Sequence, residues 1–300
     1  MLSIFVQIAS YEDPELYKTI ADAIEKSSKD TRIVFGVHAS YVNPNDISVP
    51  DSPQVKLIHT TPPNNLGLGA SRSVAHKTYE GEDFYLQIDA HSRFKPNWDL
   101  FLISEYHRYR WLGIKNPMIT AYPVPFGYEG KVEFFNTDDW VNTIKFNHET
   151  DTFKNFRFPK QTQEVNTTKS IFTPSVSGGS IFTKGPGVLP NKNVMFMGEE
   201  IVIAAMAYTR GYDLVLPQEP YMYHLYYNSY GDVMPKRKLV WTEWPEVHTN
   251  LSSISNREIY DMFTQNKIGD EYLGTVRSLK EFSEYSGLNF DTGETTEVCY

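Results

Sequence analysis

Apolar residues in the first part of the chain gather in short runs separated by polar or amphipathic stretches. The run "SIFVQIAS" at 3–10 is rich in β-branched and apolar residues, which predicts a buried strand. Similar runs at 31–39, 55–61 and 83–89 predict three further strands. The last of these, "DFYLQID", ends at an acid that is followed by Ala90 and His91.

Helical spacing appears between these strands. Residues 13–29 place Leu16, Ile20 and Ile24 on one face, with Pro14 suited to a first helical turn. Residues 68–79 predict a shorter helix. Alternating strands and helices predict βαβ units, and therefore an α/β fold with a Rossmann-like, mainly parallel central sheet flanked by helices. Ligands bind such sheets at the carboxyl ends of the strands, which is where "QID" ends.

The remainder of the chain is less regular. The patterns predict a helix at 98–113, a strand at 117–124, a polar flexible loop or lid within 127–170, a second block at 176–190, a helix at 199–208, a strand at 212–217, and short helices at 257–263 and 278–287. We find no internal repeat and no linker that separates independent units. The sequence therefore predicts a single domain over 1–300.

Composition narrows the classes of protein. A hydrophobic share of 40% with 22% charged residues is typical of a soluble globular chain. The net charge of −9 argues against holding nucleic acid by broad phosphate neutralisation. The aromatic share of 14% suits sugar or nucleobase sites, although most aromatic residues serve the core.

Cysteine use and the first residues bear on the compartment. Cys299 is the one cysteine, so no internal disulfide forms, as in a reducing compartment. The opening "MLSIFVQIAS" has no basic stretch and too short an apolar run for a signal peptide or membrane anchor. We expect a cytoplasmic protein that makes no use of a membrane.

Asp89 and His91 form a D-x-H pair at a strand end. Alternation turns both side chains to one side of an extended chain, with Ala90 facing away. Such a pair also occurs by chance at ordinary strand ends. His224, in "PYMYHLYY", belongs either to an aromatic surface patch or to the same site. One carboxylate and two imidazoles suit Mn²⁺ or a related divalent cation, with diphosphate oxygens completing the coordination.

The stretch "NNLGLGASRSVAHKTYEG" at 64–81 resembles a phosphate-cradling loop, but it matches neither a Walker loop nor a dinucleotide fingerprint. Arg72 within it has two interpretations. It pairs with a carboxylate of the protein, or it faces the metal site and contacts a diphosphate.

Two further features lie in the second half. Gly178 and Gly179 in "SVSGGS" allow the backbone to approach a ligand closely. Glu199 and Glu200 begin a predicted helix, where the helix dipole favours acids in any case. Adjacent acids on a helix point in different directions, so one is expected to face a pocket while the other is solvated.

The order of these parts resembles a known group of enzymes. "IASYEDPEL", the D-x-H of "QIDAHSRF", "SGGSIF", "GEEI" and the late histidine resemble a glycosyltransferase of the GT-A fold. More narrowly, with the tail "YLGTVRSLKEFSEYSGLNF", the chain is similar to the cytoplasmic polypeptide α-N-acetylglucosaminyltransferases. These transfer GlcNAc from UDP-GlcNAc to a hydroxyproline on a ubiquitin-ligase adaptor subunit. The resemblance covers nearly the whole chain and is loose between about 125 and 170.

The resemblance implies a role for each candidate residue. Asp89, His91 and His224 would hold Mn²⁺ on the UDP diphosphate. The remaining positions would contact the nucleotide sugar: Ala9, Ser10 and Tyr11 at the uridine, Arg72 near the nucleotide, Gly178 and Gly179 at the donor sugar, and Glu199 or Glu200 facing the sugar or acceptor, with Glu199 favoured. It also implies a nucleotide-binding half at about 1–125, an acceptor and donor-sugar half at about 171–250, and a helical tail at 251–300.

The resemblance further implies that the sugar is transferred with retention of configuration. Retaining glycosidases use a carboxylate nucleophile, and no clear second carboxylate for that role stands out in the sequence. A same-face attack, with a UDP oxygen accepting the proton of the acceptor hydroxyl, is compatible with that pattern.

Two alternatives stay open. One is a GT-A transferase with another sugar nucleotide, or with a glycan or a modified nucleic-acid base as acceptor instead of a protein. The other is a catalytically inactive relative that binds carbohydrate through the tyrosine-rich "YMYHLYYNSY". The sequence indicates neither the acceptor nor the oligomeric state.

Overall fold

The computed structural model describes residues 1–137, 140–153, 156–166, 170–189, 191–226, 237–290, 292 and 294–296, without the side chains of 147–160. Cys299 lies outside the described residues.

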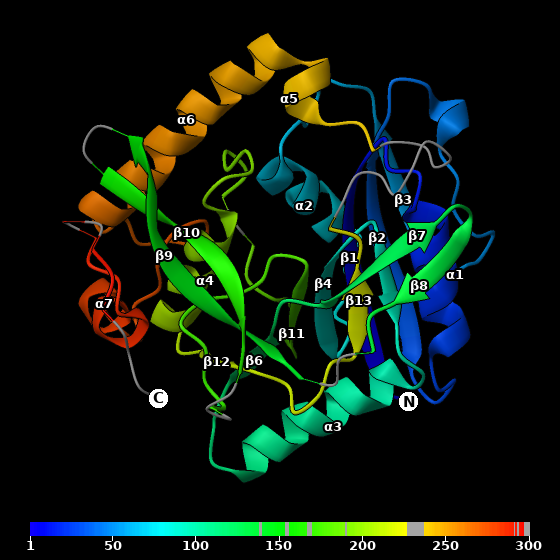
Figure 1. Ribbon diagram of the computed structural model, residues 1–300, viewed down its shortest axis with the longest axis horizontal. Coiled ribbons are helices and arrows are strands. Elements are labelled where there is room, and N and C mark those ends of the chain that lie inside the picture. Colours follow the sequence, from blue (N-terminus) through cyan, green and yellow to red (C-terminus); the bar gives the residue numbers. More distant parts are fainter. Residues whose placement is uncertain are drawn as a thin grey trace.

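The described chain forms strands, helices and one short 3₁₀ turn (Figure 1). The strands are β1 (Ser3–Tyr11), β2 (Arg32–Ser40), β3 (Val55–Thr60), β4 (Phe84–Asp89), β5 (Ser92–Phe94), β6 (Pro117–Thr120), β7 (Val124–Glu129), β8 (Val132–Phe135), β9 (Asn142–Phe153), β10 (Phe156–Val165), β11 (Ser180–Lys184), β12 (Asp213–Val215) and β13 (Met222–His224). The helices are α1 (Leu16–Lys26), α2 (Leu68–His76), α3 (Trp98–Trp111), α4 (Glu199–Thr209), α5 (Val240–Glu243), α6 (Pro245–Thr264) and α7 (Leu279–Ser286), and the turn η1 spans Pro44–Asp46.

A seven-stranded sheet in the order β12-β6-β11-β4-β1-β2-β3 forms the centre of the molecule. β1 pairs in parallel with β2 and β4, β2 pairs in parallel with β3, and β12 in parallel with β6. β11 is antiparallel to both of its neighbours, β4 and β6. The mainly parallel sheet predicted from the alternation of apolar runs is therefore confirmed.

Two apolar clusters hold helices against this sheet. In the first, side chains of α1 and α3, such as Ile20 and Leu102, pack against strands β1, β2 and β4. In the second, α4, α6 and α7 pack against the opposite end of the sheet, for example Phe282 against residues near Leu214. Figure 1 shows the second group at the left, with α6 crossing the top of the view and α7 below it.

The prediction of a loop or lid within 127–170 is wrong, because this stretch contains most of two antiparallel hairpins. β7 pairs with β8, and β9 pairs with β10 from Asn142 opposite Val165 to Phe153 opposite Phe156. The threonines and aromatic residues of "NTIKFNHETDTF" favour strands even where the alternate positions are polar. Overall polarity was therefore a poor guide to backbone structure here.

Smaller differences concern element ends. β7 joins β5, β13 and β8 in a second, four-stranded sheet, and His224 is the last residue of β13. The helix expected at 257–263 is the end of α6, which begins twelve residues earlier, at Pro245. Pro245 fits that start because its fixed φ suits a first helical turn.

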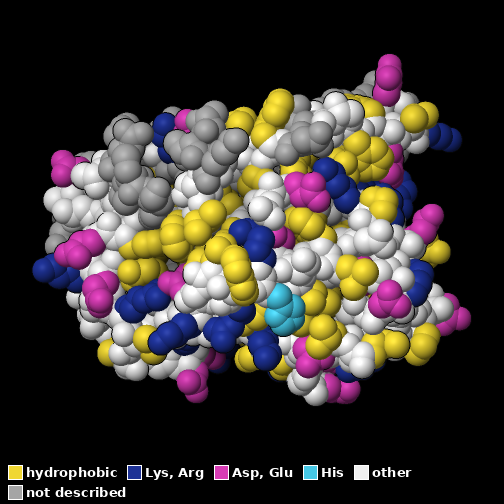
Figure 2. Space-filling view, turned by 90° about the horizontal axis from the view of Figure 1, so that it is seen from below, with side chains coloured by type: hydrophobic (Ala, Val, Ile, Leu, Met, Phe, Trp, Pro, Cys, Tyr) yellow, Lys and Arg dark blue, Asp and Glu magenta, His cyan; other side chains and the backbone are white. Residues whose placement is uncertain are grey.

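Figure 2 shows the surface seen from below, the side of the molecule on which α3 lies. Acidic and basic side chains are interspersed with apolar ones on this face. In the described part of the chain, no helix combines the length and the apolar character needed to cross a bilayer.

Candidate functional site

One large pocket, of about 770 Å³, opens at the carboxyl edge of the central sheet. We refer to it as the main pocket. Most of its walls come from four parts of the chain: 9–11 with Asp13 and Ser40, 65–68 with Ser71, Gly178 and Gly179 with 195–201, and 237–241. Asp89, His91 and His224 line it as well.

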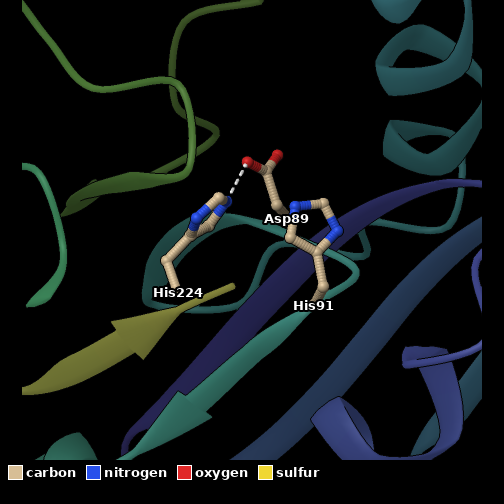
Figure 3. A group of neighbouring side chains, drawn as sticks. All are labelled: Asp89, His91 and His224. Carbon is tan, nitrogen blue, oxygen red and sulfur yellow. Dashed lines mark hydrogen bonds and ion pairs between the residues drawn. The ribbon is translucent and has the colours of Figure 1, made fainter. Parts of the chain in front are cut away.

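The three predicted metal ligands converge in this pocket (Figure 3). Asp89, His91 and His224 offer one ligand atom each, and these atoms lie within 4.8 Å of one another. Nε2 of His224 is 3.1 Å from Oδ2 of Asp89. The side chains of the three residues are 28%, 15% and 11% exposed, so each is shielded yet reachable from the pocket.

Strand pairing explains how residues so far apart in the sequence meet. Asp89 is the last residue of β4, and His91 lies in the bend before β5. β13 is antiparallel to β5 with His224 opposite Ser92, one position from His91. The second sheet thus carries the late histidine to the end of β4, where the D-x-H pair leaves the central sheet.

Asp13 supports His91 from behind. Its Oδ2 is 2.8 Å from Nδ1 of His91, and its Oδ1 accepts the backbone N–H of Glu15 at 2.9 Å. Burial would raise the pKa of Asp13, but His91 and the N–H of Glu15 outweigh burial and lower it. An ionised Asp13 keeps the proton of the imidazole on Nδ1, which leaves Nε2 with a lone pair for a cation.

The protonation states of the other two residues also fit a divalent cation. Burial opposes ionisation of Asp89, but His224, His91 and Arg72 hold the pKa of its carboxyl well below the usual value. Burial lowers the pKa of His224 to about 4, so its imidazole is neutral at physiological pH. Its Nδ1 is buried without a hydrogen-bond partner in the described structure and can carry the proton when Nε2 binds a cation.

Arg72 is completely buried and bonds to the protein on several sides. Its Nε donates to Glu199 at 2.6 Å, and its Nη2 donates to Asp89 at 3.2 Å and to the carbonyl of Gly178 at 3.0 Å. The interpretation of Arg72 as the partner of protein carboxylates is thus the one observed. Arg72 is absent from the wall of the main pocket and contacts it through Asp89, Glu199 and the carbonyl of Gly178.

Glu199 and Glu200 both line the main pocket, so the expectation that one of them is solvated is wrong. The carboxylate of Glu200 accepts hydrogen bonds from the backbone of Gly178 at 2.9 Å, from Tyr122 at 3.1 Å and from Gln161 at 2.7 Å. Burial raises the pKa of Glu200 to about 7 despite these donors. Glu199, 4% exposed, is fixed by Arg72.

The two glycines lie where any side chain would collide with these acids. A Cβ on Gly178 would be 2.8 Å from Oε2 of Glu199, and one on Gly179 would be 2.8 Å from Oδ2 of Asp89. Both contacts are shorter than ordinary van der Waals distances. The paired glycines therefore give the acids their room, in addition to any role toward a ligand.

Ala9, Ser10 and Tyr11, at the carboxyl end of the first strand, line the pocket. In the glycine-rich stretch, Gly67 lines the pocket with φ of 110°, a conformation that favours glycine. Gly69 instead packs on a neighbouring loop, where an added Cβ would lie 2.3 Å from the carbonyl of Asn191.

Three residues at this site were not predicted from the sequence: Asp13, Tyr122 and Gln161. Asp13 is 78 residues from its partner His91, and Tyr122 is 78 residues from Glu200. Gln161 lies in the stretch that we expected to be irregular. For Asp13 the position after the first strand was a signal, because that end of a parallel strand meets the end of β4.

The chain is similar to the solved structure of GalNAc-T7 with UDP, GalNAc and Mn²⁺, with a TM-score of 0.57 and 15% identity over 94% of this chain. It spans about half of that protein, 54% of the other chain. Weaker likenesses, too low to support an argument, are to S. aureus TarS (TM-score 0.42, 10% identity, 88% of this chain and 44% of that chain) and to TarS 1–349 with UDP-GlcNAc (0.38, 12%, 88% and 73%). No curated protein sequence matches the chain.

The central sheet, with its one antiparallel inner strand and its site at the carboxyl edge, defines an α/β protein of the GT-A glycosyltransferase fold. The model of the family described as Glycosyltransferase (GlcNAc) matches residues 45–292, so the chain belongs to this family.

Proposed function

We propose that this chain is a metal-dependent glycosyltransferase that moves a sugar, GlcNAc, from UDP-GlcNAc to a hydroxyl acceptor. The observation that carries the proposal is the convergence of Asp89, His91 and His224 on one point of the main pocket. Family membership and the similarity to a transferase structure with UDP, GalNAc and Mn²⁺ support the donor class.

In this proposal, Asp89, His91 and His224 hold Mn²⁺ or a related cation, in agreement with a donor set of one oxygen and two nitrogens. When bound, such a cation would neutralise the negative charge that develops on the departing UDP. Asp13 orients His91, and Arg72 orients Asp89, so the ligands are positioned before the donor arrives.

A second cationic side chain faces the place proposed for the diphosphate. Arg237 lines the main pocket, and its Nε is buried without a hydrogen-bond partner in the described structure. Because Arg72 is completely buried and donates to protein groups, we assign the direct contact with the diphosphate to Arg237 and a positioning role to Arg72.

Ala9, Ser10 and Tyr11 line the end of the pocket that we assign to the uridine, and Gly178 and Gly179 the part that we assign to the donor sugar. Of the two acids, we propose that Glu199 faces the sugar. Its Oε1 is held by Arg72, and the neighbouring Gly178 leaves room beside its Oε2.

We further propose retention of configuration, with the acceptor hydroxyl attacking from the face that UDP leaves. If so, Glu199→Gln slows transfer, and intact-protein mass spectrometry detects no glycosyl adduct. Detection of an adduct in either form of the protein would contradict the same-face attack.

The acceptor proposal follows the likeness to the hydroxyproline GlcNAc-transferases. The pocket rim carries exposed apolar side chains, Phe196, Met197 and Trp241, which are 47%, 52% and 42% exposed. The rings of Phe196 and Trp241 are 5.5 Å apart. Such a rim suits an acceptor with an apolar ring, such as a hydroxyproline in a peptide. Cytoplasmic location accords with this acceptor and is part of the proposal.

The decisive experiment measures UDP release from a panel of UDP-sugars with Mn²⁺, alone and with peptides that contain hydroxyproline or proline. We expect release from UDP-GlcNAc that depends on Mn²⁺ and is faster with the hydroxyproline peptide. Asp89→Ala should abolish both Mn²⁺-dependent UDP binding and release. UDP binding that survives this substitution would refute the metal assignment, and binding without release from any donor would indicate an inactive carbohydrate-binding relative.

A further inference from the structure

A buried chain of hydrogen bonds runs from β3 to the main pocket. Nε2 of His38 is 2.8 Å from Oγ1 of Thr60, and Nδ1 of His38 is 2.7 Å from Oγ of Ser71. His38 is completely buried, and Ser71, on α2, is 8% exposed. Ser71 lines the main pocket, whereas His38 and Thr60 do not.

The direction of these hydrogen bonds is fixed by the far end of the chain. Oγ1 of Thr60 donates to the carbonyl of Asn64 at 3.2 Å, which uses the single proton of that hydroxyl. With its proton directed to Asn64, Oγ1 of Thr60 accepts the hydrogen bond from Nε2–H of His38. Burial lowers the pKa of His38 to about 4, so the ring is neutral and carries one proton. Its Nδ1 is then an acceptor, and the hydroxyl of Ser71 donates to it.

Ser71 consequently has no proton left for the pocket and presents only lone pairs to a ligand. Ser40 is 3% exposed, lines the same pocket, and has an Oγ without a hydrogen-bond partner in the described structure. Ser40 and His38 are two residues apart on β2 and share one side of the strand. This corner of the pocket thus offers an acceptor of fixed polarity and a hydroxyl that is free to donate.

We propose that Ser71, held as an obligate acceptor by His38 and Thr60, selects uracil by accepting its N3–H, while Ser40 donates to a neighbouring carbonyl of the base. This inference rests on the proposed function, because it presumes a nucleoside diphosphate donor in the main pocket. Uracil presents a donor at N3 between two carbonyl acceptors. Cytosine presents an acceptor at N3, which would face the lone pairs of Ser71, and so it is rejected.

Calorimetric titration of the full chain with Mn²⁺ and UDP, CDP or N3-methyl-UDP tests this assignment. The unmodified protein should bind UDP about tenfold or more tightly than either analogue, because a mismatch leaves buried polar groups unpaired. Ser71→Ala should weaken UDP binding and leave the two analogues nearly unchanged, so that the preference disappears. Ser73→Ala, on the same helix and away from the pocket, is the matched control and should keep the preference.

A second variant tests whether the polarity of the Ser71 hydroxyl selects the base, without removing any side chain that lines the pocket. Thr60→Val keeps the shape of the side chain but removes the acceptor for Nε2–H of His38. The ring proton can then sit on Nδ1 and donate to Ser71, so the hydroxyl of Ser71 is free to donate into the pocket. The preference for UDP over CDP should fall even though Thr60 does not line the pocket. Thermal unfolding of each variant shows whether the fold is intact.

The outcomes distinguish this inference from the proposed function. If the unmodified protein binds none of the nucleotides with Mn²⁺, the proposed function itself fails. If it binds UDP without preference, or if Ser71→Ala weakens all three nucleotides equally, only the assignment of Ser71 fails. A preference that persists in both Ser71→Ala and Thr60→Val would also overturn it.

Discussion

Oδ2 of Asp13 lies 2.8 Å from Nδ1 of His91, so that the first loop of the chain orients a candidate metal ligand 78 residues away. Carboxylates that bond to the outer nitrogen of a ligating histidine fix its tautomer and raise its basicity. This contact makes Asp13 part of the metal site without making it a ligand.

Asp13→Asn should therefore weaken Mn²⁺ binding by about 10- to 100-fold, as is common for such outer partners. The amide keeps the size of the side chain but removes the charge that favours a proton on Nδ1. Mn²⁺ titration followed by electron paramagnetic resonance measures the affinity. Glu25→Gln, at an exposed acid on helix α1 that does not line the main pocket, is the control. An unchanged affinity in Asp13→Asn would show that His91 is oriented by other groups.

Arg72 is predicted to matter for stability as much as for the site. Arg72→Ala leaves Glu199 and Asp89 without their buried partner, which should lower the free energy of unfolding by about 3–5 kcal/mol. Chemical denaturation provides the measurement. Adding Glu199→Gln to Arg72→Ala should recover part of the loss, because one uncompensated charge is removed. If the changes in the free energy of unfolding of the two single substitutions simply add up in the double variant, Arg72 and Glu199 are not directly coupled.

The two adjacent glycines should have separable effects. Gly179→Ala brings a methyl group to within 2.8 Å of Oδ2 of Asp89, so it should lower Mn²⁺ affinity by about tenfold or more. Gly178→Ala collides with Glu199 instead, so it should slow transfer and leave metal affinity close to normal. Parallel metal titrations and UDP-release assays distinguish the two. Equal losses of metal affinity would mean that the loop moves as one unit.

Glu200 predicts a pH dependence of stability. Its pKa is raised from 4.5 to about 7 in the folded protein, so the folded state binds the proton more tightly than the unfolded state does. The stability that this proton contributes is fully present below about pH 4.5 and is lost as the pH rises through 7. The effect is on the order of 3 kcal/mol.

Comparison with Glu200→Gln separates the contribution of Glu200 to the free energy of unfolding from that of the other carboxylates. The free energy of unfolding of the unmodified protein, relative to that of Glu200→Gln, should fall between pH 5 and pH 8. Denaturation curves at several pH values measure the difference. A difference that stays constant across this range would show that Glu200 is ionised throughout.

The sequence predicted the parts of the fold that are set by local patterns. The apolar runs that became β1 to β4 are buried, and their alternation with helices predicted the parallel sheet. It did not predict β11 as an antiparallel strand inside that sheet, because pairing with β4 and β6 depends on residues far along the chain. The hairpin of β9 and β10 was missed since its polar residues resemble those of a loop.

The same distinction applies to the site. Asp89 and His91 were predicted from a motif within one strand end, whereas His224 gained its role from the resemblance and from the pairing of β13 with β5. Arg72 was recognised as important, but its choice of partners was open until the positions of Glu199 and Asp89 were known. The polarity of Ser71 depends on Thr60 and Asn64 and has no signature in the sequence.

The position of β11 has a consequence for synthesis on the ribosome. β4 and β6 cannot be joined until Ser180–Lys184 has emerged, so the central sheet is incomplete while the first 179 residues are being made. The cluster of Asp89, His91 and His224 is completed later still, when β13 pairs with β5. A nascent chain that is released early would therefore lack the cation site, and the ability to bind metal would report that translation has passed residue 224.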